Sequence, residues 1–389
     1  MQEEQKSCTN KLYSWIVVFC FFLLLTGFAV AEICLPDQTI SESERRYYAT
    51  LPELSWESIL DGNYMQDIEE YLLDQFAGRD TFRIAKTEIE TTLLGKSDAN
   101  NYVKVEDYLF ELDYDWSKKQ VTKTAQEFAK LQEEWFAEAK VYYAVIPDKA
   151  SFLPKEEYPV GDDGWILEQM QKYLVDASYI DLYPYLTIED YYKTDLHWKQ
   201  EAIVDVAATL LDGMQAADTT GETVAAEHVP TTEELLQRYT SSLITSAFYG
   251  GYAGASAFKT IPDELVSLTN ETIETARVYD YEAAKETTVY APEKVEGTDP
   301  YDYYLWGARA LLTIENPLCE NGKKLLLFRD SFGSSIAPLL LEEYEEITLV
   351  DLRYLVADYL PELLELNEYD DVMFLYSENI LRNSGSLKF

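Results

Sequence analysis

Strand and helix patterns alternate along this sequence, which predicts an α/β fold with a parallel sheet flanked by helices. Residues 141–146 read Val-Tyr-Tyr-Ala-Val-Ile, a continuous apolar run typical of a strand that is covered on both faces. Towards the carboxyl end, a strand pattern at 324–328, a turn, a helix pattern at 335–343 and a strand pattern at 346–350 follow one another. Parallel strands joined by helices in this order form right-handed crossovers, so the sheet is expected to be largely parallel.

An apolar segment near the N-terminus precedes the predicted domain. Residues 14–31 contain no charged residue, and about 18 such residues can span a bilayer as a helix. Lys6 and Lys11 come before the segment, so the positive-inside rule places the body of the protein outside the cytoplasm. The length of the run favours an uncleaved anchor within residues 1–34, which predicts a single-pass cell-membrane protein. A signal peptide cleaved after residues 29–31 is the alternative, and it would make the protein secreted.

The rest of the chain divides by composition and hydrophobic spacing. Residues 35–56 are polar and are expected to form a stalk, and residues 57–389 are expected to form the folded domain. Residues 57–94 show helical spacing with a break at Gly78. Further patterns predict a hairpin (100–115), three helices (122–140, 162–177 and 200–217), a strand with a turn (178–186) and a final helix and strand (361–377). Residues 218–300 show no clean period and are expected to form an irregular, mostly β insertion.

The composition excludes one class of partner. The 71 acidic and 31 basic residues give a formal net charge of -40, which repels the phosphates of nucleic acids and of anionic lipids. The simplest interpretation of this charge is an acidic surface that keeps the protein soluble. Of the four cysteines, Cys8 and Cys20 lie before or within the apolar run, and Cys34 and Cys319 lie after it. Two cysteines are too few for a disulfide framework.

One serine stands where an α/β fold places its chemistry. Ser331 lies in the turn Phe-Arg-Asp-Ser-Phe-Gly-Ser-Ser, residues 328–335, between a buried strand pattern and a helix pattern. Ligands of open α/β sheets bind at the carboxyl ends of strands, so a serine in this turn can act as a nucleophile. The free N–H groups at the start of the helix can hold an oxyanion. A helix N-cap explains the same serine equally well.

The chain has only two histidines, His197 and His228. His228 lies in a polar stretch, so His197 is the better candidate for acid–base chemistry near neutral pH. Asp195 precedes it by two positions, which puts both side chains on one side of an extended segment. A neutral imidazole can take the proton of Ser331 while the carboxylate fixes its tautomer. The alternative is a buried histidine satisfied by an acid, with Trp198 as core; a zinc site lacks further ligands.

Several motifs together resemble the DHHW protein family, which is related to the acyltransferases that O-acetylate alginate and falls in the SGNH hydrolase-like group. Four of them read TDLHW, LLLFRDSFGSSIAPLL, DLRYL and DVMFLYS. Three more, YLLDQFAGRDTFR, YYAVIPDKASFLP and DYYLWGARALLTIEN, also stand at the expected places in the order of the family's motifs. The resemblance covers most of residues 57–389. It implies an SGNH hydrolase-like (flavodoxin-like) sheet for this domain.

Carried over to this sequence, the resemblance implies a catalytic triad of Ser331, His197 and Asp195. These are the residues that the turn and the scarcity of histidine single out independently. Trp198 is expected to contact the substrate, because it follows His197 directly. Leu196 stands where the family name implies a second histidine, and the alginate-type relatives tolerate variation there.

A second departure concerns the oxyanion hole. Members of the family often read Gly-Gly-Asn where this chain has Trp-Gly-Ala at residues 306–308. In SGNH-type sites a Gly and an Asn help to form the oxyanion hole, and the loss of one donor costs about 3–4 kcal/mol of transition-state stabilisation. The backbone at Gly333 is the replacement donor that we expect. Without a replacement, the protein is slow or not catalytic.

Two functions follow from these expectations. The first is an extracytoplasmic O-acyl (acetyl) transferase or esterase that acts on a cell-surface polysaccharide through an acyl-enzyme on Ser331, without a cofactor or metal. Because acyl-CoA is not expected outside the cell, the resemblance implies a multipass membrane-bound O-acyltransferase as the partner that supplies acyl groups. The second is a non-catalytic protein of the cell envelope that uses the same fold to bind glycan or to act as a scaffold.

Overall fold

The computed structural model describes residues 2–41, 43–114, 116–220 and 232–389, so His228 lies outside the described residues. The chain forms two compact units, Met1–Lys96 and Ser97–Phe389. The second unit contains the sheet and all the predicted site residues. The helices that follow the predicted stalk, between residues 57 and 94, belong to the first unit together with the N-terminal helix.

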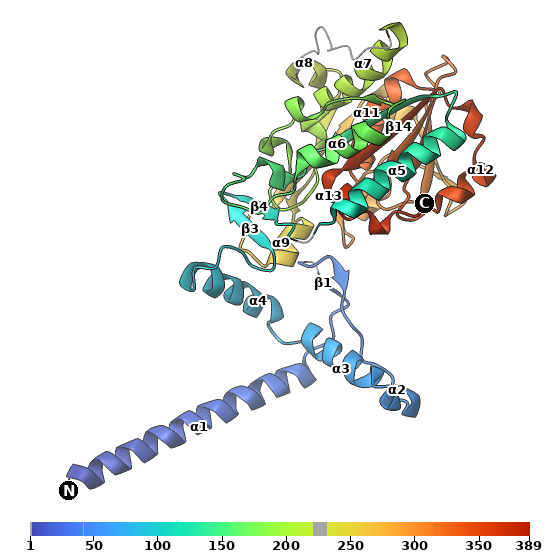
Figure 1. The fold of residues 1–389 in the computed structure, drawn as a ribbon. Helices are drawn as coiled ribbons and strands as arrows, with labels where there is room; N and C mark the ends of the chain where they lie inside the picture. Colours follow the sequence, from blue (N-terminus) through green and yellow to red (C-terminus); the bar gives the residue numbers. More distant parts are fainter. Residues whose placement is uncertain (1, 42, 115, 221–231) are drawn as a thin grey trace. The chain divides into compact units, whose positions relative to one another are not determined.

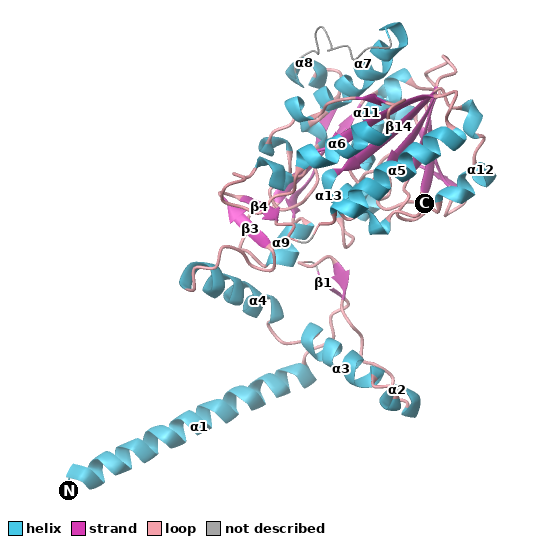
Figure 2. Ribbon diagram, viewed as in Figure 1, coloured by secondary structure: helices cyan, strands magenta, loops and turns pink. Residues whose placement is uncertain are grey.

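The second unit is built on an eight-stranded sheet (Figures 1 and 2). In sheet order its strands are β10 (Lys285–Thr287), β9 (Arg277–Asp280), β11 (Leu311–Glu315), β13 (Glu346–Val350), β12 (Lys324–Arg329), β14 (Asp371–Ser377), β5 (Lys140–Ile146) and β6 (Ser178–Tyr179). The strands from β13 to β6 run parallel, whereas β11, β9 and β10 add antiparallel pairs at one edge. The predicted α/β class is therefore confirmed, with a mixed, mostly parallel sheet.

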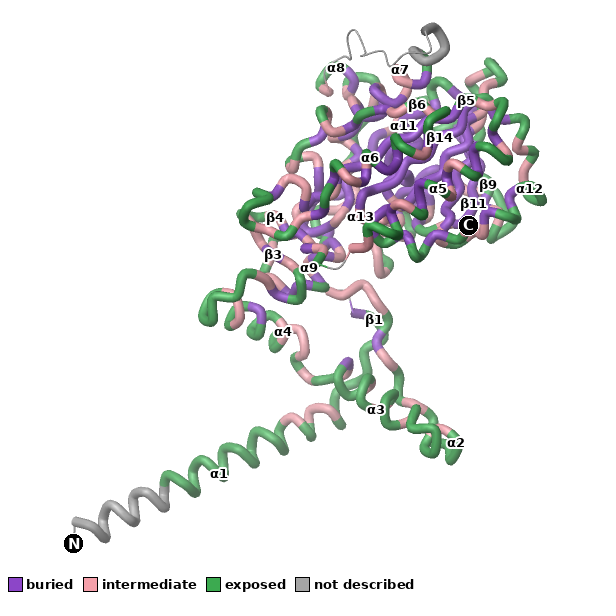
Figure 3. Tube along the Cα trace, viewed as in Figure 1, coloured by how far each residue is buried: buried purple, intermediate pink, exposed green. Residues whose placement is uncertain are grey.

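Helices cover both faces of this sheet. Along β5, Tyr142 and Ala144 enter one hydrophobic core, and Val141, Tyr143 and Val145 enter the other, because successive side chains of a strand point to opposite faces. The first core is closed by α7 (Val204–Thr220) and α11 (Gly333–Leu340), and the second by α5 (Lys118–Trp135), α6 (Asp163–Tyr173) and α13 (Glu378–Arg382). Figure 3 shows the buried residues concentrated along these strands and the inner sides of the helices.

The sequence explains α5 in physical terms. Ser117 caps its N-terminus by accepting a hydrogen bond from the backbone N–H of Gln120 at 3.4 Å. Its buried residues recur every three or four positions, which brings Phe128 against Phe374 and Tyr376 of β14 at ring distances of 4.7 and 5.2 Å. Burying one such aromatic side chain is worth about 2–3 kcal/mol. The helix is therefore fixed by its apolar side against the sheet.

The predicted hairpin consists of β3 (Tyr102–Val105) and β4 (Tyr108–Glu111). The described part of residues 218–300 contains a second pair, β7 (Thr240–Phe248) and β8 (Asp263–Thr269), and the edge strands β9 and β10. The register between β7 and β8 shifts twice, which explains why this region shows no clean period in the sequence. Short helices α8 (Thr232–Leu236), α9 (Gly251–Ser256) and α10 (Glu271–Thr275) lie in the same region, and α12 (Leu360–Leu363) precedes β14.

The first unit begins with α1 (Gln2–Cys34). Its residues 13–34 are long and apolar enough to cross a membrane, which is compatible with an anchor or a signal peptide. A two-stranded pair, β1 (Ile40–Ser41) and β2 (Arg46–Tyr47), comes next. It is followed by α2 (Trp56–Leu60), α3 (Asn63–Asp74), α4 (Arg79–Glu88) and a π-helical turn (Ile89–Leu93). Gly78, with φ of +77°, separates α3 from α4 at the predicted break.

Candidate active site

Three side chains from two distant parts of the chain form one continuous line of hydrogen bonds. Oγ of Ser331 lies 2.7 Å from Nε2 of His197, and Nδ1 of the same ring lies 2.6 Å from Oδ1 of Asp195. Ser331 is partly exposed, His197 is almost buried and Asp195 is fully buried. The structure thus brings together the three residues that the sequence analysis named. The line runs from a serine at the surface to a carboxylate in the interior.

The local geometry of Asp195 differs from the extended segment that we predicted. Residues 191 and 198 form an isolated antiparallel bridge, and a tight turn connects them. Within this turn, Oδ1 of Asp195 accepts a hydrogen bond from the backbone N–H of His197 at 3.1 Å, as in an Asx turn. Oδ2 of Asp195 accepts from the N–H of Gly251 at 2.8 Å. The short spacing of Asp and His therefore works through a turn and not through a strand.

Asp263 and Gly250 also hold this turn in place through hydrogen bonds. The Asp263 carboxylate accepts from the backbone N–H groups of Lys193 and Thr194, both at 2.8 Å, and from the Thr194 hydroxyl at 2.6 Å. Gly250 donates its N–H to the Thr194 hydroxyl at 2.8 Å. A side chain at Gly250 would overlap the carbonyl group of Thr194 and the Cβ of Asp195, so only glycine fits here.

Lys149 is the residue of this site that the sequence analysis missed. It is fully buried, and its Nζ donates to the backbone carbonyls of Tyr192, Lys193 and Asp195 at 2.7, 3.2 and 2.9 Å. Burial lowers the pKa of Lys149 to about 7, and the Asp195 carboxylate opposes that shift. Its only signal in the sequence is its place just after the apolar strand, in Ile-Pro-Asp-Lys.

Aromatic side chains fix the plane of the imidazole. The His197 ring stacks on Tyr301 with centroids 3.8 Å apart and an interplanar angle of 8°, and Phe332 approaches at 4.9 Å. The hydroxyl of Tyr301 and Nε1 of Trp198 both donate to Oγ of Ser335 at 2.9 Å. Trp198 is fully buried, so it has no surface on which a sugar can stack. This burial does not support the substrate contact that we expected of Trp198.

The turn that carries Ser331 is held by the buried Asp330. Its Oδ1 accepts from the N–H of Phe332 at 3.0 Å, and its Oδ2 accepts from the N–H and the hydroxyl of Ser377 at 2.8 and 2.6 Å. The N–H of Gly333 donates to the Asp330 carbonyl at 3.1 Å and is engaged within the turn. Gly333 is therefore a poor oxyanion donor in this conformation. In the described part of the chain, the N–H of Ser331 itself has no acceptor.

Gly333 has a different, steric role. A Cβ at this position would overlap the side chain of Arg329, which is fully buried at the end of β12. The segment at residues 306–308 supplies no replacement donor from a side chain, because Ala308 is exposed and ends in a methyl group. The indole of Trp306 donates instead to the carbonyl of Thr288 at 2.9 Å. The departure noted in the sequence therefore persists in the structure.

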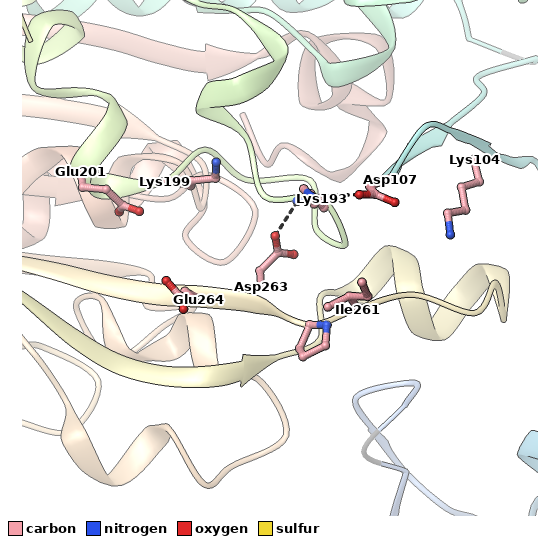
Figure 4. Close-up of a pocket in the computed structure, with 9 residues that line it drawn as sticks. Lys104, Asp107, Lys193, Lys199, Glu201, Ile261, Asp263 and Glu264 are labelled. Atoms are coloured by element: carbon pink, nitrogen blue, oxygen red, sulfur yellow. Dashed lines mark hydrogen bonds and ion pairs between the residues drawn. The ribbon is translucent and has the colours of Figure 1, made fainter.

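A pocket of about 370 Å³ adjoins the turn that carries Asp195 and His197 (Figure 4). Lys193 and Lys199, which lie on either side of Asp195 and His197 in the sequence, both line it, and so does Asp263. Its other lining residues are Lys104, Asp107, Glu201, Ile261, Pro262 and Glu264. Neither Ser331 nor His197 lines this pocket, so it does not contain the candidate reacting atoms.

No family model matches this sequence, and no curated protein matches it. Solved structures do match. A DHHW family protein from Eubacterium siraeum has a TM-score of 0.58 at 20% identity, over 74% of this chain and 95% of that one. PatB1 from Bacillus cereus with a sulfonyl adduct has a TM-score of 0.55 at 19% identity, over 72% of this chain and 96% of that one.

A second PatB1 structure from Bacillus cereus scores 0.51 at 19% identity, over 72% of this chain and 97% of that one. The O-acetyltransferase domain of Pseudomonas putida AlgJ superposes less well, with a TM-score of 0.43 at 10% identity, over 72% and 92%. Sequence identities this low support a shared fold and nothing more specific. The Ser97–Phe389 unit thus confirms the fold that the motifs predicted, and this chain shares it with the DHHW family protein and with PatB1.

Proposed function

We propose that this protein is an extracytoplasmic serine acyltransferase or esterase that acts on O-acyl groups of a cell-surface polysaccharide. The observation that carries the proposal is the hydrogen-bonded line from Ser331 through His197 to Asp195. A neutral imidazole accepts the serine proton at Nε2 only if Nδ1 carries the other proton, and the carboxylate at Nδ1 selects that tautomer. The fold shared with the DHHW family protein and PatB1 supports the same reaction class.

The arrangement accounts for both halves of an acyl transfer. As Oγ of Ser331 attacks the carbonyl carbon of the donor ester, its proton passes to Nε2 of His197, and the leaving alcohol then takes that proton from the imidazolium. Asp195 stabilises the imidazolium, and an acyl-serine ester remains. In the second half, a sugar hydroxyl gives its proton to His197 and takes the acyl group, which restores Ser331. Water in place of the sugar gives hydrolysis.

The oxyanion formed in each half needs hydrogen-bond donors. The N–H of Ser331 is the one backbone donor of the turn that we assign to it, because the N–H groups of Phe332 and Gly333 are engaged within the turn. A single missing donor costs about 3 kcal/mol, so slow turnover is expected. We propose that the acyl donor is supplied by a membrane-bound O-acyltransferase, since the domain is expected outside the cytoplasm.

The second candidate function is a non-catalytic glycan-binding or scaffold protein of the cell envelope. The observation that favours it is the exposed methyl group of Ala308 together with the engaged amide of Gly333. Both candidates use the same fold. They differ in whether Ser331 becomes acylated.

The test uses the full chain in detergent micelles with two probes, an activated acetyl ester and an arylsulfonyl fluoride. Intact mass over time is expected to show an acetyl adduct that forms and decays and a sulfonyl adduct that persists. Ser331→Ala is expected to abolish both. Ser334→Ala, in the same turn, is the matched control and is expected to keep both. If folded wild-type protein gives neither adduct, the catalytic proposal fails and the binding function gains support.

A further inference from the structure

The helices that follow α1 in the first unit expose an unusual amount of apolar surface. On α3, the side chains of Met65, Leu72 and Leu73 are 64, 48 and 61% exposed and lie on one side of the helix, and Phe76, just after α3, is 39% exposed. On α4, Phe82 is also half exposed. Soluble proteins rarely leave contiguous apolar patches of this kind uncovered, so the face of α3 and α4 calls for a partner surface.

An aromatic trio joins this face to the apolar segment of α1. The ring of Phe28 lies 5.2 Å from that of Phe76 and 5.6 Å from that of Phe82, and the last two are 5.7 Å apart. Phe28 lies within the segment that is long enough to cross a membrane, which ends at Cys34. At 1.5 Å per residue, the trio lies about 9 Å before the end of that segment. If α1 spans a bilayer, Phe76 and Phe82 therefore lie at the depth of its outer leaflet.

Polar contacts fix the same junction. Oε2 of Glu32, near the end of α1, accepts from the backbone N–H of Ala77 at 3.2 Å. The Gln75 side chain accepts from the N–H of Gln38 at 2.9 Å and donates to its carbonyl at 3.0 Å. The segment after α3 is thus held to the end of α1 at Glu32 and to the chain just after α1 at Gln38. Figure 1 shows α3 and α4 leaving this junction crosswise to the axis of α1.

We propose that α3 and α4 form an interfacial collar that lies in the outer leaflet of the membrane around the anchor. A helix crosswise to a spanning helix lies along the bilayer plane, where its apolar side is buried among lipid and its polar side meets water. Asp67 and Glu70 lie on the opposite side of α3 and are exposed. Because that side is acidic, it does not attract anionic headgroups, and α3 binds the membrane through its apolar side. The apolar side therefore contacts the zwitterionic lipid of the outer leaflet. Glu69 is exposed on the apolar side, and its carboxylate is expected to turn towards the headgroups.

The collar requires that α1 stays attached, since the trio needs Phe28. It does not depend on the chemistry at Ser331. It also does not need a second protein, which allows a test in pure lipid.

The experiment places one spin label at a time on the full chain in phosphatidylcholine nanodiscs. The background carries Ser in place of Cys8, Cys20, Cys34 and Cys319. Met65→Cys reports the apolar side of α3. Asp67→Cys, two residues further on and almost on the opposite side, is the matched control. Both native side chains are exposed, so the labels are not expected to disturb the fold.

Power saturation with oxygen, which is concentrated in lipid, and with a water-soluble nickel chelate measures what each label contacts. The label at 65 is expected to relax at least several-fold more with oxygen than with nickel, and the label at 67 is expected to show the reverse. Equal access of nickel to both positions would overturn the proposal and would assign the apolar face to a protein partner. Release of α1 from the mature protein, detected by intact mass in membranes, would also overturn it.

Discussion

Nζ of Lys149 lies 2.9 Å from the backbone carbonyl oxygen of Asp195, and both residues are fully buried. The carbonyl of Asp195 is thus held by an ammonium group, while its carboxylate is held by the N–H of Gly251 and faces Nδ1 of His197. The backbone and the side chain of Asp195 are therefore both held in place. The geometry of the hydrogen-bonded line from Ser331 to Asp195 therefore depends on groups that are not part of that line.

Lys149→Met is expected to leave the buried carbonyls of Tyr192 and Asp195 without the donor Lys149 and to lower the free energy of unfolding by about 2–3 kcal/mol. The rate of acyl adduct formation is expected to fall as well, because the turn that carries Asp195 loses its support. Urea unfolding and intact mass measure the two effects. Lys104→Met is the control, since Lys104 contacts one exposed carbonyl, that of Lys259. Equal effects of the two substitutions would refute the role of Lys149.

Glu201 gives a prediction about pH. Burial raises its pKa to about 7, and in the described part of the chain its Oε2 is buried without a hydrogen-bond partner. The folded state therefore holds a proton that the unfolded state releases between about pH 4.5 and 7, so wild-type stability falls as the pH rises through that window. Glu201→Gln is expected to be more stable than wild type by on the order of 2 kcal/mol at pH 8, with no difference at pH 4.

Thermal or urea unfolding at several pH values tests this expectation. Glu264→Gln, at an exposed position of the same pocket, retains Glu201 and is the control (Figure 4). Its stability is expected to fall with rising pH as in the wild type, with the window moved slightly to lower pH because the Glu264 charge contributes to the raised pKa of Glu201. A constant difference between wild type and Glu201→Gln across pH 4–8 would show that Glu201 is not protonated on folding.

Gly250→Ala is expected to push the Thr194 carbonyl and the Asp195 side chain out of place. Overpacking of this kind costs about 1–3 kcal/mol, and the shift of Asp195 should slow adduct formation more than the loss of stability alone explains. Gly164→Ala, near the start of α6, is the control: a Cβ there meets Oδ1 of Asp162 at an ordinary 3.6 Å. That control is expected to keep wild-type stability and adduct rate. The prediction fails if both alanine variants behave alike.

The sequence alone predicted the features that follow from periodicity and from chain order. The apolar run of β5 and the strand–turn–helix at Ser331 have local patterns, and the parallel sheet follows from their alternation. Ser331 and His197 are 134 residues apart, and their meeting was expected because nucleophile and base must meet in a triad and because the motifs resemble a known family.

Other features carry no local pattern. Lysine is almost always exposed, so the place of Lys149 just after an apolar strand did not suffice to predict that it is buried. The stacking of Tyr301 on His197 depends on tertiary packing among many tyrosines. For Trp198 the sequence left open a substrate contact and a place in the core, and its complete burial agrees with the core alternative. The antiparallel edge strands β9 and β10 are too short to show a period of two.

Asp195→Asn separates the two proposed functions most directly. The single amide oxygen can accept from the backbone N–H of Gly251 or of His197 but not from both, so the free energy of unfolding is expected to fall by about 1–3 kcal/mol while the protein stays folded. The amide can no longer both select the Nδ1–H tautomer and stabilise an imidazolium. The rate of acyl adduct formation on Ser331 is therefore expected to fall by about 10³–10⁴-fold if the triad is catalytic.

A glycan-binding protein would keep its affinity for its polysaccharide after the same substitution, because binding needs no imidazolium. Stopped-flow measurement of adduct formation, alongside glycan binding by calorimetry, distinguishes the two outcomes, and an unchanged adduct rate would remove Asp195 from the reaction.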